Sequence, residues 1–228
     1  MDAFDASLAS IIAARDRAES AGYGKRLNYF VADFNNCALS QRTYDIVFFH
    51  QSLHHVARIE GLLEQVTHAL TKKGLVYLDE YIGPSRTEWS DERIAGHRAI
   101  YDRLPEHVKM TSQLPLPIQA DDPSEAIRSG EILAKLKELF KIVAFRGYGG
   151  NLLSVVFPNL RRDELNDDVV HELIEADRNL VQAEGKPYYA VMLATPKRGV
   201  RGMLARARYW LEPKVKRIIN ELLHTVSR

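Results

Sequence analysis

The apolar run YDIVFF at residues 44–49 most strongly limits the folds open to this chain. A short, continuous apolar strand is typical of a parallel sheet that helices cover on both faces, so we expect this strand to be fully buried. A polar cluster, HQS at residues 50–52, follows at once, with two more histidines directly behind it. The run is therefore either a strand that carries catalytic or binding side chains to a cleft, or a core strand with a polar end.

Predicted strands and helices alternate along the chain, which indicates an α/β fold. The connections are long enough for crossovers, so we expect a Rossmann-like, doubly wound and mostly parallel sheet. Residues 104–123 contain four prolines and are expected to form an irregular cover. Strands are predicted at residues 26–32, 44–49, 75–79, 141–150 and 187–195, and helices at 7–20, 58–71, 88–103, 125–139 and 162–184.

Polar side chains follow the strands of the first half of the chain. In open α/β sheets, ligands bind beyond the carboxyl ends of the strands, so these side chains are the first candidates for a site. They are Asp5, Asp33, His50, Gln51, Glu80 and Tyr81.

Charge and cysteine content narrow the class of protein. The formal net charge of the 228 residues is +1, which gives no overall field that would favour nucleic acid. The single cysteine, Cys37, excludes an internal disulfide and suits a reducing compartment. The first 14 residues hold two acids and no lysine or arginine, unlike a secretory signal. We therefore expect a soluble cytoplasmic protein.

The last 32 residues differ from the rest. Residues 197–228 hold nine Lys or Arg and two Asp or Glu, a net charge of 9 − 2 = +7, and apolar residues recur there at helical spacing. We therefore divide the chain into residues 1–196 and a basic, amphipathic helical extension at 197–228. This extension can pack on the acidic domain, mediate a homodimer, bind an acidic partner or lie on an anionic membrane surface.

Several motifs together resemble class I S-adenosylmethionine-dependent methyltransferases. FDAS and VADFNN place an acid after each of two strands, and YDIVFFHQSLHHV and ALTKKGLVYLDEY follow in the family's order. SLHHV and EYIGPSRTEW look like a bacterial subgroup with the motifs SLHH and EYxGPSRxxW, and DPSEAIRSGEIL and GYGGNLL also look like it. The resemblance covers residues 2–196.

The resemblance implies a cofactor, S-adenosyl-L-methionine, and residues that bind it. Asp5 would accept hydrogen bonds from the ribose hydroxyls, as a carboxylate does strongly. Asp33 would accept from the adenine amino group, with the ring of Phe34 against the purine. His50 and Gln51 would lie near the methionyl moiety.

One family feature is missing before Asp5. The first strand and its glycine-rich loop, of the type ExGxGxG, would precede that acid, whereas Met1 stands four residues before it. We therefore interpret the chain as a methyltransferase fold truncated at its amino end: Met1 is a late start in a longer protein, or the chain is a degenerate relative, or another segment takes the place of the loop. The missing strand would lie between the second and fourth strands of the family, so both of those strands would lose a ladder partner.

The implied activity is methyl transfer to a hydroxyl or amine group of a small molecule or glycan. The resemblance places Glu80 and Tyr81 on the acceptor side. Of His54 and His55, we expect His55 to be the better candidate for a general base, since an imidazole titrates near neutral pH, and His55 or Glu80 would take the acceptor proton. The alternatives are structural roles: His54 and His55 would pack at the start of a helix, and the carboxylate of Glu80 would anchor a lid. With one cysteine, and no ligand spacing among His68, His97 and His107, we expect no metal site. The alternative function is a non-catalytic binding module that acts through its basic extension.

Overall fold

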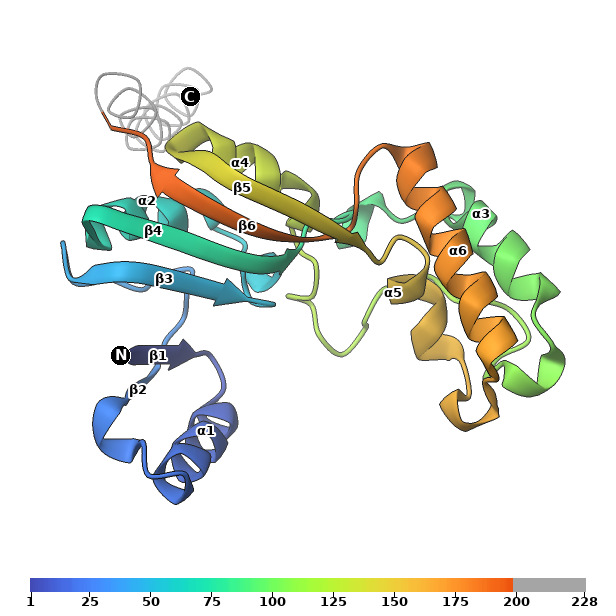
Figure 1. Ribbon diagram of the computed structural model, residues 1–228, viewed down its shortest axis with the longest axis horizontal. Coiled ribbons are helices and arrows are strands. Elements are labelled where there is room, and N and C mark those ends of the chain that lie inside the picture. The colour runs from blue at the N-terminus through green and yellow to red at the C-terminus, as the bar shows by residue number, and fades with distance from the viewer. Residues whose placement is uncertain (199–228) are drawn as a thin grey trace, which may run out of the picture.

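A computed structural model gives the arrangement of the chain (Figure 1) and describes residues 1–198. The predicted basic extension at 197–228 therefore lies almost wholly outside the described residues. No helix among those described is long and apolar enough to cross a lipid bilayer.

Strands and helices alternate as the sequence predicts. The elements of the first half are β1 (Asp2–Asp5), α1 (Leu8–Ser20), β2 (Asn28–Val31), β3 (Tyr44–His50), α2 (Ile59–Ala69) and β4 (Leu70–Tyr81). Those of the second half are α3 (Asp91–Arg103), α4 (Ile132–Leu139), β5 (Phe140–Gly149), α5 (Leu153–Val156), α6 (Asp167–Glu184) and β6 (Tyr189–Pro196).

Local sequence explains where two of the helices begin and end. The hydroxyl of Ser7 accepts a hydrogen bond from the Ser10 amide and caps α1, and the side chain of Asn166 caps α6 in the same way. Helix α6 ends at Gly185, whose φ of 69° is left-handed and suits glycine. Helices α4 and α6 begin later than the helices predicted at 125–139 and 162–184, and α5 was not predicted.

The strands form two separate sheets. The larger has the order β3-β4-β6-β5, in which β3 and β4 are parallel and β6 is antiparallel to both of its neighbours. The smaller is the parallel pair β1-β2, with α1 beside it. The fold is thus Rossmann-like, as expected, but its strands are divided between two sheets.

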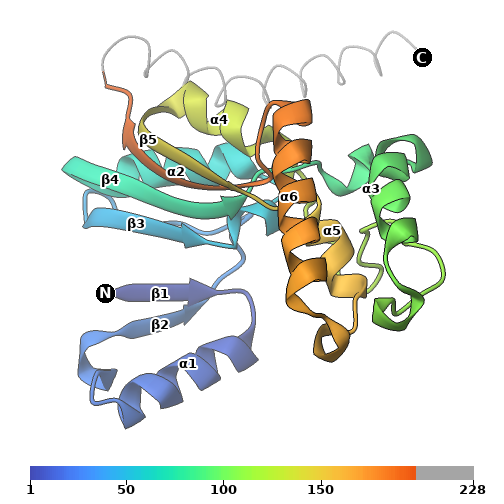
Figure 2. The ribbon, with the colours of Figure 1, turned by 45° about the vertical axis from the view of Figure 1, so that its right-hand side comes forward.

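Contacts at both ends of β1 and β3 hold the smaller sheet beside the larger one, with these two strands running in the same direction. At the start of the strands, the Tyr44 hydroxyl donates to Asp2 Oδ2 at 2.8 Å. Past their carboxyl ends, the amide of Arg58 donates to Asn35 Oδ1 at 2.9 Å. Strands β1 and β3 therefore point the same way (Figures 1 and 2), although no described strand pairs with the edges that they turn toward each other.

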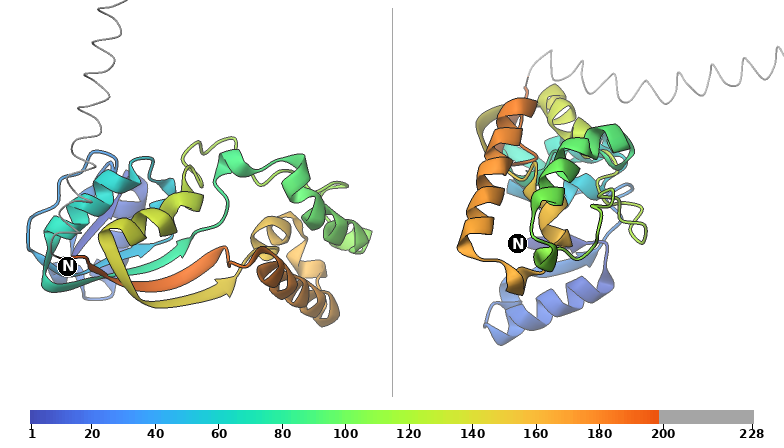
Figure 3. Two further views of the ribbon diagram at one scale, coloured as in Figure 1. Left: turned by 90° about the horizontal axis from the view of Figure 1, so that it is seen from above. Right: turned by 90° about the vertical axis from the view of Figure 1, so that its right-hand side faces the viewer.

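The expectation that residues 44–49 are fully buried is wrong. Val47 and Phe49 pack in the core, whereas the side chains on the opposite face, Ile46 and Phe48, are 45% and 61% exposed. Helices α2 and α4 lie together on one face of the larger sheet (Figure 3), and none of the other described helices packs over the opposite face of β3. An apolar run can thus mark a strand without being covered on both sides.

The buried side chains form two groups. One lies between the larger sheet and helices α2 and α4, and includes Ile59, Leu63, Val76 and Leu136. The other fills a helical lobe made of α3, α5 and α6, which lies beyond the carboxyl end of β4 (Figure 1). The lobe thus stands next to the sheet edge at which a ligand is expected.

Arg128 ties the segment before α4 to the start of α2. Its guanidinium donates to both carboxylate oxygens of Glu60, at 2.9 and 2.7 Å, and also to Glu131. Burial opposes the charge on Glu60, but Arg128 and Lys135 outweigh it and lower the pKa of Glu60 from 4.5 to about 2. This lowering stabilises the fold above pH 4.5, and the benefit is lost as the pH falls toward 2.

Replacing Arg128 with glutamine should lower the free energy of unfolding at pH 7 by about 2 kcal/mol, because Glu60 keeps its burial but loses its strongest partner. Lys135 stays 3.1 Å from Glu60, so part of the stabilisation remains. Urea unfolding at pH 7 and pH 3 should show a smaller loss of stability on acidification in Arg128→Gln than in the native chain. The control is Arg178→Gln, which breaks an exposed pair with Glu175 and should change little. Equal acid sensitivity of all three proteins would contradict this account.

Candidate functional site

Five polar side chains gather where the parallel strands end, and we call them the strand-end rim: Asp5, Asp33, His50, Gln51 and Asp79. Asp5 closes β1 and pairs in register with Val31, just before Asp33. His50 closes β3 and pairs in register with Asp79 of β4. Because both parallel pairs point the same way, these residues lie at one edge of the molecule.

The two acids from the smaller sheet are held in tight turns. Asp5 Oδ1 accepts from the Ser7 amide at 2.7 Å. The carboxylate of Asp33 accepts from the Asn35 amide at 2.9 Å and from Asn36 Nδ2 at 2.6 Å, and these bonds lower the pKa of Asp33. These contacts fix the direction of each carboxylate. Such a fixed carboxylate is equally suited to stabilising a turn and to binding a ligand.

Phe34 does not stand free beside Asp33. Its ring is partly buried and packs against the core under the larger sheet, together with Cys37 and Leu39. The side chain thus anchors the loop after β2. Only the exposed part of its ring is available to a ligand.

The end of β3 has an unusual backbone. Gln51 has a φ of 48°, in the left-handed region that residues other than glycine seldom adopt, and such positions cluster at functional sites. Its amide donates to the Asp79 carbonyl at 2.9 Å, and its Nε2 donates to the same carbonyl at 3.3 Å. The loop after β3 is therefore held firmly against β4.

Asp79 organises the rim, although the sequence did not single it out. His50 Nδ1 lies 3.4 Å from Asp79 Oδ2, and the Tyr148 hydroxyl donates to Asp79 Oδ1 at 2.6 Å. Burial and this bond raise the pKa of Tyr148. The available signal was the position of Asp79 in LVYLDEY, directly before Glu80 at the carboxyl end of the same strand.

A second group lies next to the rim, and we call it the histidine cluster: His54, His55, Glu80, Asp122 and Glu125. Glu80 is completely buried at its centre. One carboxylate oxygen accepts from the amides of Ser52 and Leu53, and the other accepts from the Tyr81 amide and contacts His54 Nδ1. All of these contacts are internal, so the geometry favours Glu80 as a residue that positions the loop after β3.

His54 lies between two carboxylates. Its side chain is 7% exposed; Nδ1 contacts Glu80, and Nε2 lies 3.6 Å from Glu125 Oε2. Burial disfavours the charged imidazole, but the bonds to Glu125 and Glu80 outweigh it and raise the pKa of His54 to about 9. The same contact with His54 lowers the pKa of Glu125.

His55 is the more accessible of the two histidines, with 35% of its side chain exposed. Its Nδ1 lies 3.0 Å from the Ser124 hydroxyl, which donates to Asp122 Oδ1 at 2.6 Å. Its Nε2 lies 3.4 Å from Glu125 Oε2. Of the three predicted acceptor-side residues, His55 is therefore the one with substantial contact with solvent.

Tyr81 is enclosed by other aromatic rings. Its hydroxyl donates to the Pro84 carbonyl at 3.2 Å, and its ring meets Tyr188 and Tyr189 edge-on. Burial raises the pKa of Tyr81, so the phenol stays protonated. This arrangement suits a wall of the site.

Asp122, Ser124 and Glu125 were not predicted as site residues. They belong to the stretch DDPSE, about 70 residues after the histidines in sequence. Backbone bonds bring this loop back, since the Ile127 amide donates to the His54 carbonyl at 3.1 Å. The only signal was that DPSEAIRSGEIL belongs to the motifs of the resembled subgroup.

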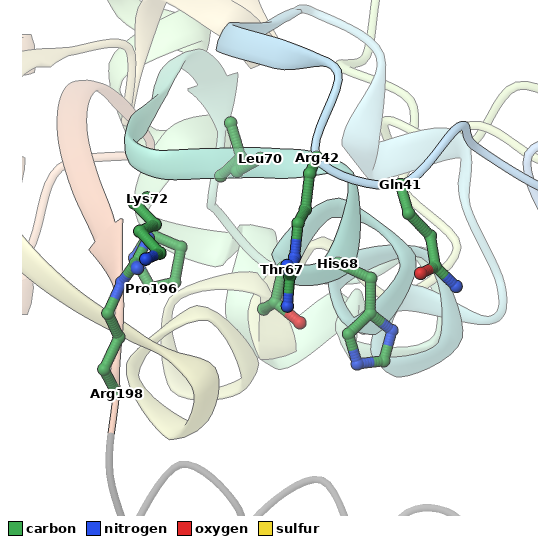
Figure 4. Close-up of a pocket in the computed structure, with 8 residues that line it drawn as sticks. All are labelled: Gln41, Arg42, Thr67, His68, Leu70, Lys72, Pro196 and Arg198. Carbon is green, nitrogen blue, oxygen red and sulfur yellow. The ribbon is translucent and has the colours of Figure 1, made fainter.

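A hollow of about 310 Å³ lies elsewhere, at the start of β4 and the end of β6 (Figure 4). Its lining includes Arg42, His68, Lys72 and Arg198, which come from the opposite edge to the strand-end rim. Ligands of open α/β sheets bind at the carboxyl ends of the parallel strands, so we do not assign the site to this hollow.

The first third of the chain resembles a known protein family. Residues 2–78 match the family model of a methyltransferase domain. No curated protein sequence matches the chain significantly.

Solved structures resemble the chain at low sequence identity. Geranyl diphosphate C-methyltransferase from Streptomyces coelicolor A3(2) has a TM-score of 0.50 at 12% identity, over 86% of this chain and 62% of that one. An S-adenosylmethionine-dependent methyltransferase from Mesorhizobium loti has a TM-score of 0.44 at 16% identity, over 86% and 79%. The [4+2]-cyclase SpnF has a TM-score of 0.48 at 13% identity, over 87% and 67%. The strand order described above and the likeness to the C-methyltransferase agree on a Rossmann-like fold, and the first third of the chain matches a methyltransferase domain.

Proposed function

We propose that this chain transfers a methyl group from S-adenosylmethionine to a hydroxyl or amine group of a small molecule or glycan. The observation that carries the proposal is the strand-end rim, where β1, β2, β3 and β4 bring acidic, amide and imidazole groups to one edge. The match of residues 2–78 to a methyltransferase domain supports it.

The rim has the donor and acceptor groups that the cofactor requires. Asp5 is assigned to the ribose hydroxyls and Asp33 to the adenine amino group, because a fixed carboxylate accepts such bonds strongly. Gln51 and His50 are assigned to the methionyl end, since the loop after β3 is held rigidly against Asp79. The cofactor supplies a methyl group on a positively charged sulfur when it is bound.

The histidine cluster is assigned to the acceptor. His55 Nε2 takes the proton of the acceptor hydroxyl or ammonium group, while Glu80 and Ser124 hold the two histidines in place. Tyr81 and the aromatic rings around it wall the acceptor side. Most of the rate increase then comes from holding the two reactants in line at short distance.

Asp33 tests the cofactor assignment. Replacing it with asparagine removes a charge-assisted bond and should weaken binding of S-adenosylhomocysteine by about 10-fold to 100-fold in titration calorimetry. The matched control is Asp16→Asn, an exposed acid on α1, which should bind like the native chain. Absence of binding to the native chain, with the fold intact by circular dichroism, would overturn the proposal and favour a non-catalytic binding module.

His55 tests the acceptor assignment. His55→Gln should slow formation of S-adenosylhomocysteine by about 100-fold or more with an active acceptor, because general bases contribute that much. A panel of hydroxyl and amine acceptors is screened first with the native chain. Binding of S-adenosylhomocysteine should not change in the variant, and the exposed His68→Gln should keep full activity. A variant that retains the native rate would remove His55 from catalysis.

A further inference from the structure

Three side chains of the histidine cluster converge on one point. His54 Nε2 and His55 Nε2 lie 3.6 and 3.4 Å from Glu125 Oε2, and the three ligand atoms all lie within 4.8 Å of one another. Around a single ion with bonds of about 2.1 Å, neighbouring ligand atoms are roughly 3.0 to 3.5 Å apart. We propose that His54, His55 and Glu125 bind one divalent transition-metal ion.

The other nitrogen of each imidazole has a partner that turns Nε2 toward this point. Nδ1 of His54 contacts the buried Glu80, and Nδ1 of His55 lies 3.0 Å from the Ser124 hydroxyl. That hydroxyl gives its own proton to Asp122, so it accepts from His55. Metal-binding histidines are oriented by hydrogen bonds of this kind through the nitrogen that does not hold the metal.

The surrounding backbone keeps the ligands in place. Glu80 accepts from the amides of Ser52 and Leu53, just before the two histidines. The loop that carries Glu125 is held by the Ile127 amide, which donates to the His54 carbonyl. The backbone therefore holds all three side chains at one place.

The charge of the cluster also calls for a cation. Three carboxylates, Glu80, Asp122 and Glu125, lie around the two imidazoles. Two nearby guanidinium groups are engaged elsewhere: Arg86 donates to the carbonyls of Asp122 and Gln119, and Arg128 donates to Glu60 and Glu131. The charged form of His54 offsets one of these carboxylates, and a divalent ion bound in place of its proton would offset two.

The ligand set indicates the type of ion. Two imidazoles and one carboxylate suit Zn²⁺, Fe²⁺ or Co²⁺, whereas Mg²⁺ and Ca²⁺ prefer oxygen ligands alone. Three protein ligands leave positions open for water or substrate, as catalytic sites do. The partial exposure of His55 and Glu125, 35% and 26%, gives the ion a path from solvent. A bound ion would hold His55 Nε2 as a ligand and would supply Lewis acidity for an acceptor oxygen, so the role of His55 as a base would apply to the metal-free chain.

The full chain, treated with a chelator and dialysed, should bind one equivalent of Co²⁺ or Zn²⁺. Co²⁺ binding is followed by its visible absorption and Zn²⁺ binding by calorimetry, with Mg²⁺ as the ion expected not to compete. Glu125→Gln should weaken binding at least 100-fold, and Glu80→Gln about 10-fold to 100-fold through the orientation of His54.

Controls separate this site from other histidines and acids. His68→Gln and Glu172→Gln change exposed residues outside the cluster and should bind Co²⁺ like the native chain. His55→Gln, at a half-exposed position, gives a second loss-of-ligand variant if Glu125→Gln does not fold. The proposal would be overturned if the native chain does not bind one equivalent of metal. It would also be overturned if Glu125→Gln and His55→Gln both bind Co²⁺ with the affinity of the native chain. Because metal binding is read without any methyl transfer, its failure is distinct from failure of the proposed function.

Discussion

The bonds to the buried carboxylate of Glu80 hold the candidate site together. Glu80 stands near the end of β4 and accepts from the amides of Ser52 and Leu53 and from Tyr81, while it contacts His54 Nδ1. A buried carboxylate is costly unless its oxygens are satisfied, and here each accepts more than one bond. The loop after β3 therefore has one arrangement, which presents Gln51 to the strand-end rim and the two histidines to the lobe.

The rim and the histidine cluster divide the proposed reaction between them. The rim holds fixed carboxylates and an amide, the groups that recognise a nucleoside, whereas the cluster holds imidazoles between carboxylates, the groups that move a proton or bind a metal ion. Both begin in the short loop after β3, since Gln51 and His55 are four residues apart. The fold alone would not assign chemistry, because one fold serves many reactions.

The sequence predicted the features that depend on local pattern. Period and capping predicted α1, α2 and β3, and the order of strands predicted that Asp5, Asp33 and His50 would share an edge. It did not predict the exposure of Phe48, because cover on the second face depends on segments far from β3 in the chain. It missed Glu125 for the same reason: the contact with His54 joins residues about 70 positions apart, through a loop whose prolines indicated only irregular structure. The expectation of no metal site rested on cysteine and histidine spacing alone, which takes no account of a carboxylate about 70 positions away in the chain.

The central claim is that the strand-end rim binds the adenosine of the cofactor. Backbone amide shifts in heteronuclear NMR, recorded as S-adenosylhomocysteine is added to the full chain, test it most directly. The account predicts saturable shifts centred on Asp5, Asp33 and Gln51, with the amides of Arg42 and His68 at the opposite edge unmoved. Shifts centred on Arg42 and His68, with those three residues of the rim unchanged, would contradict it.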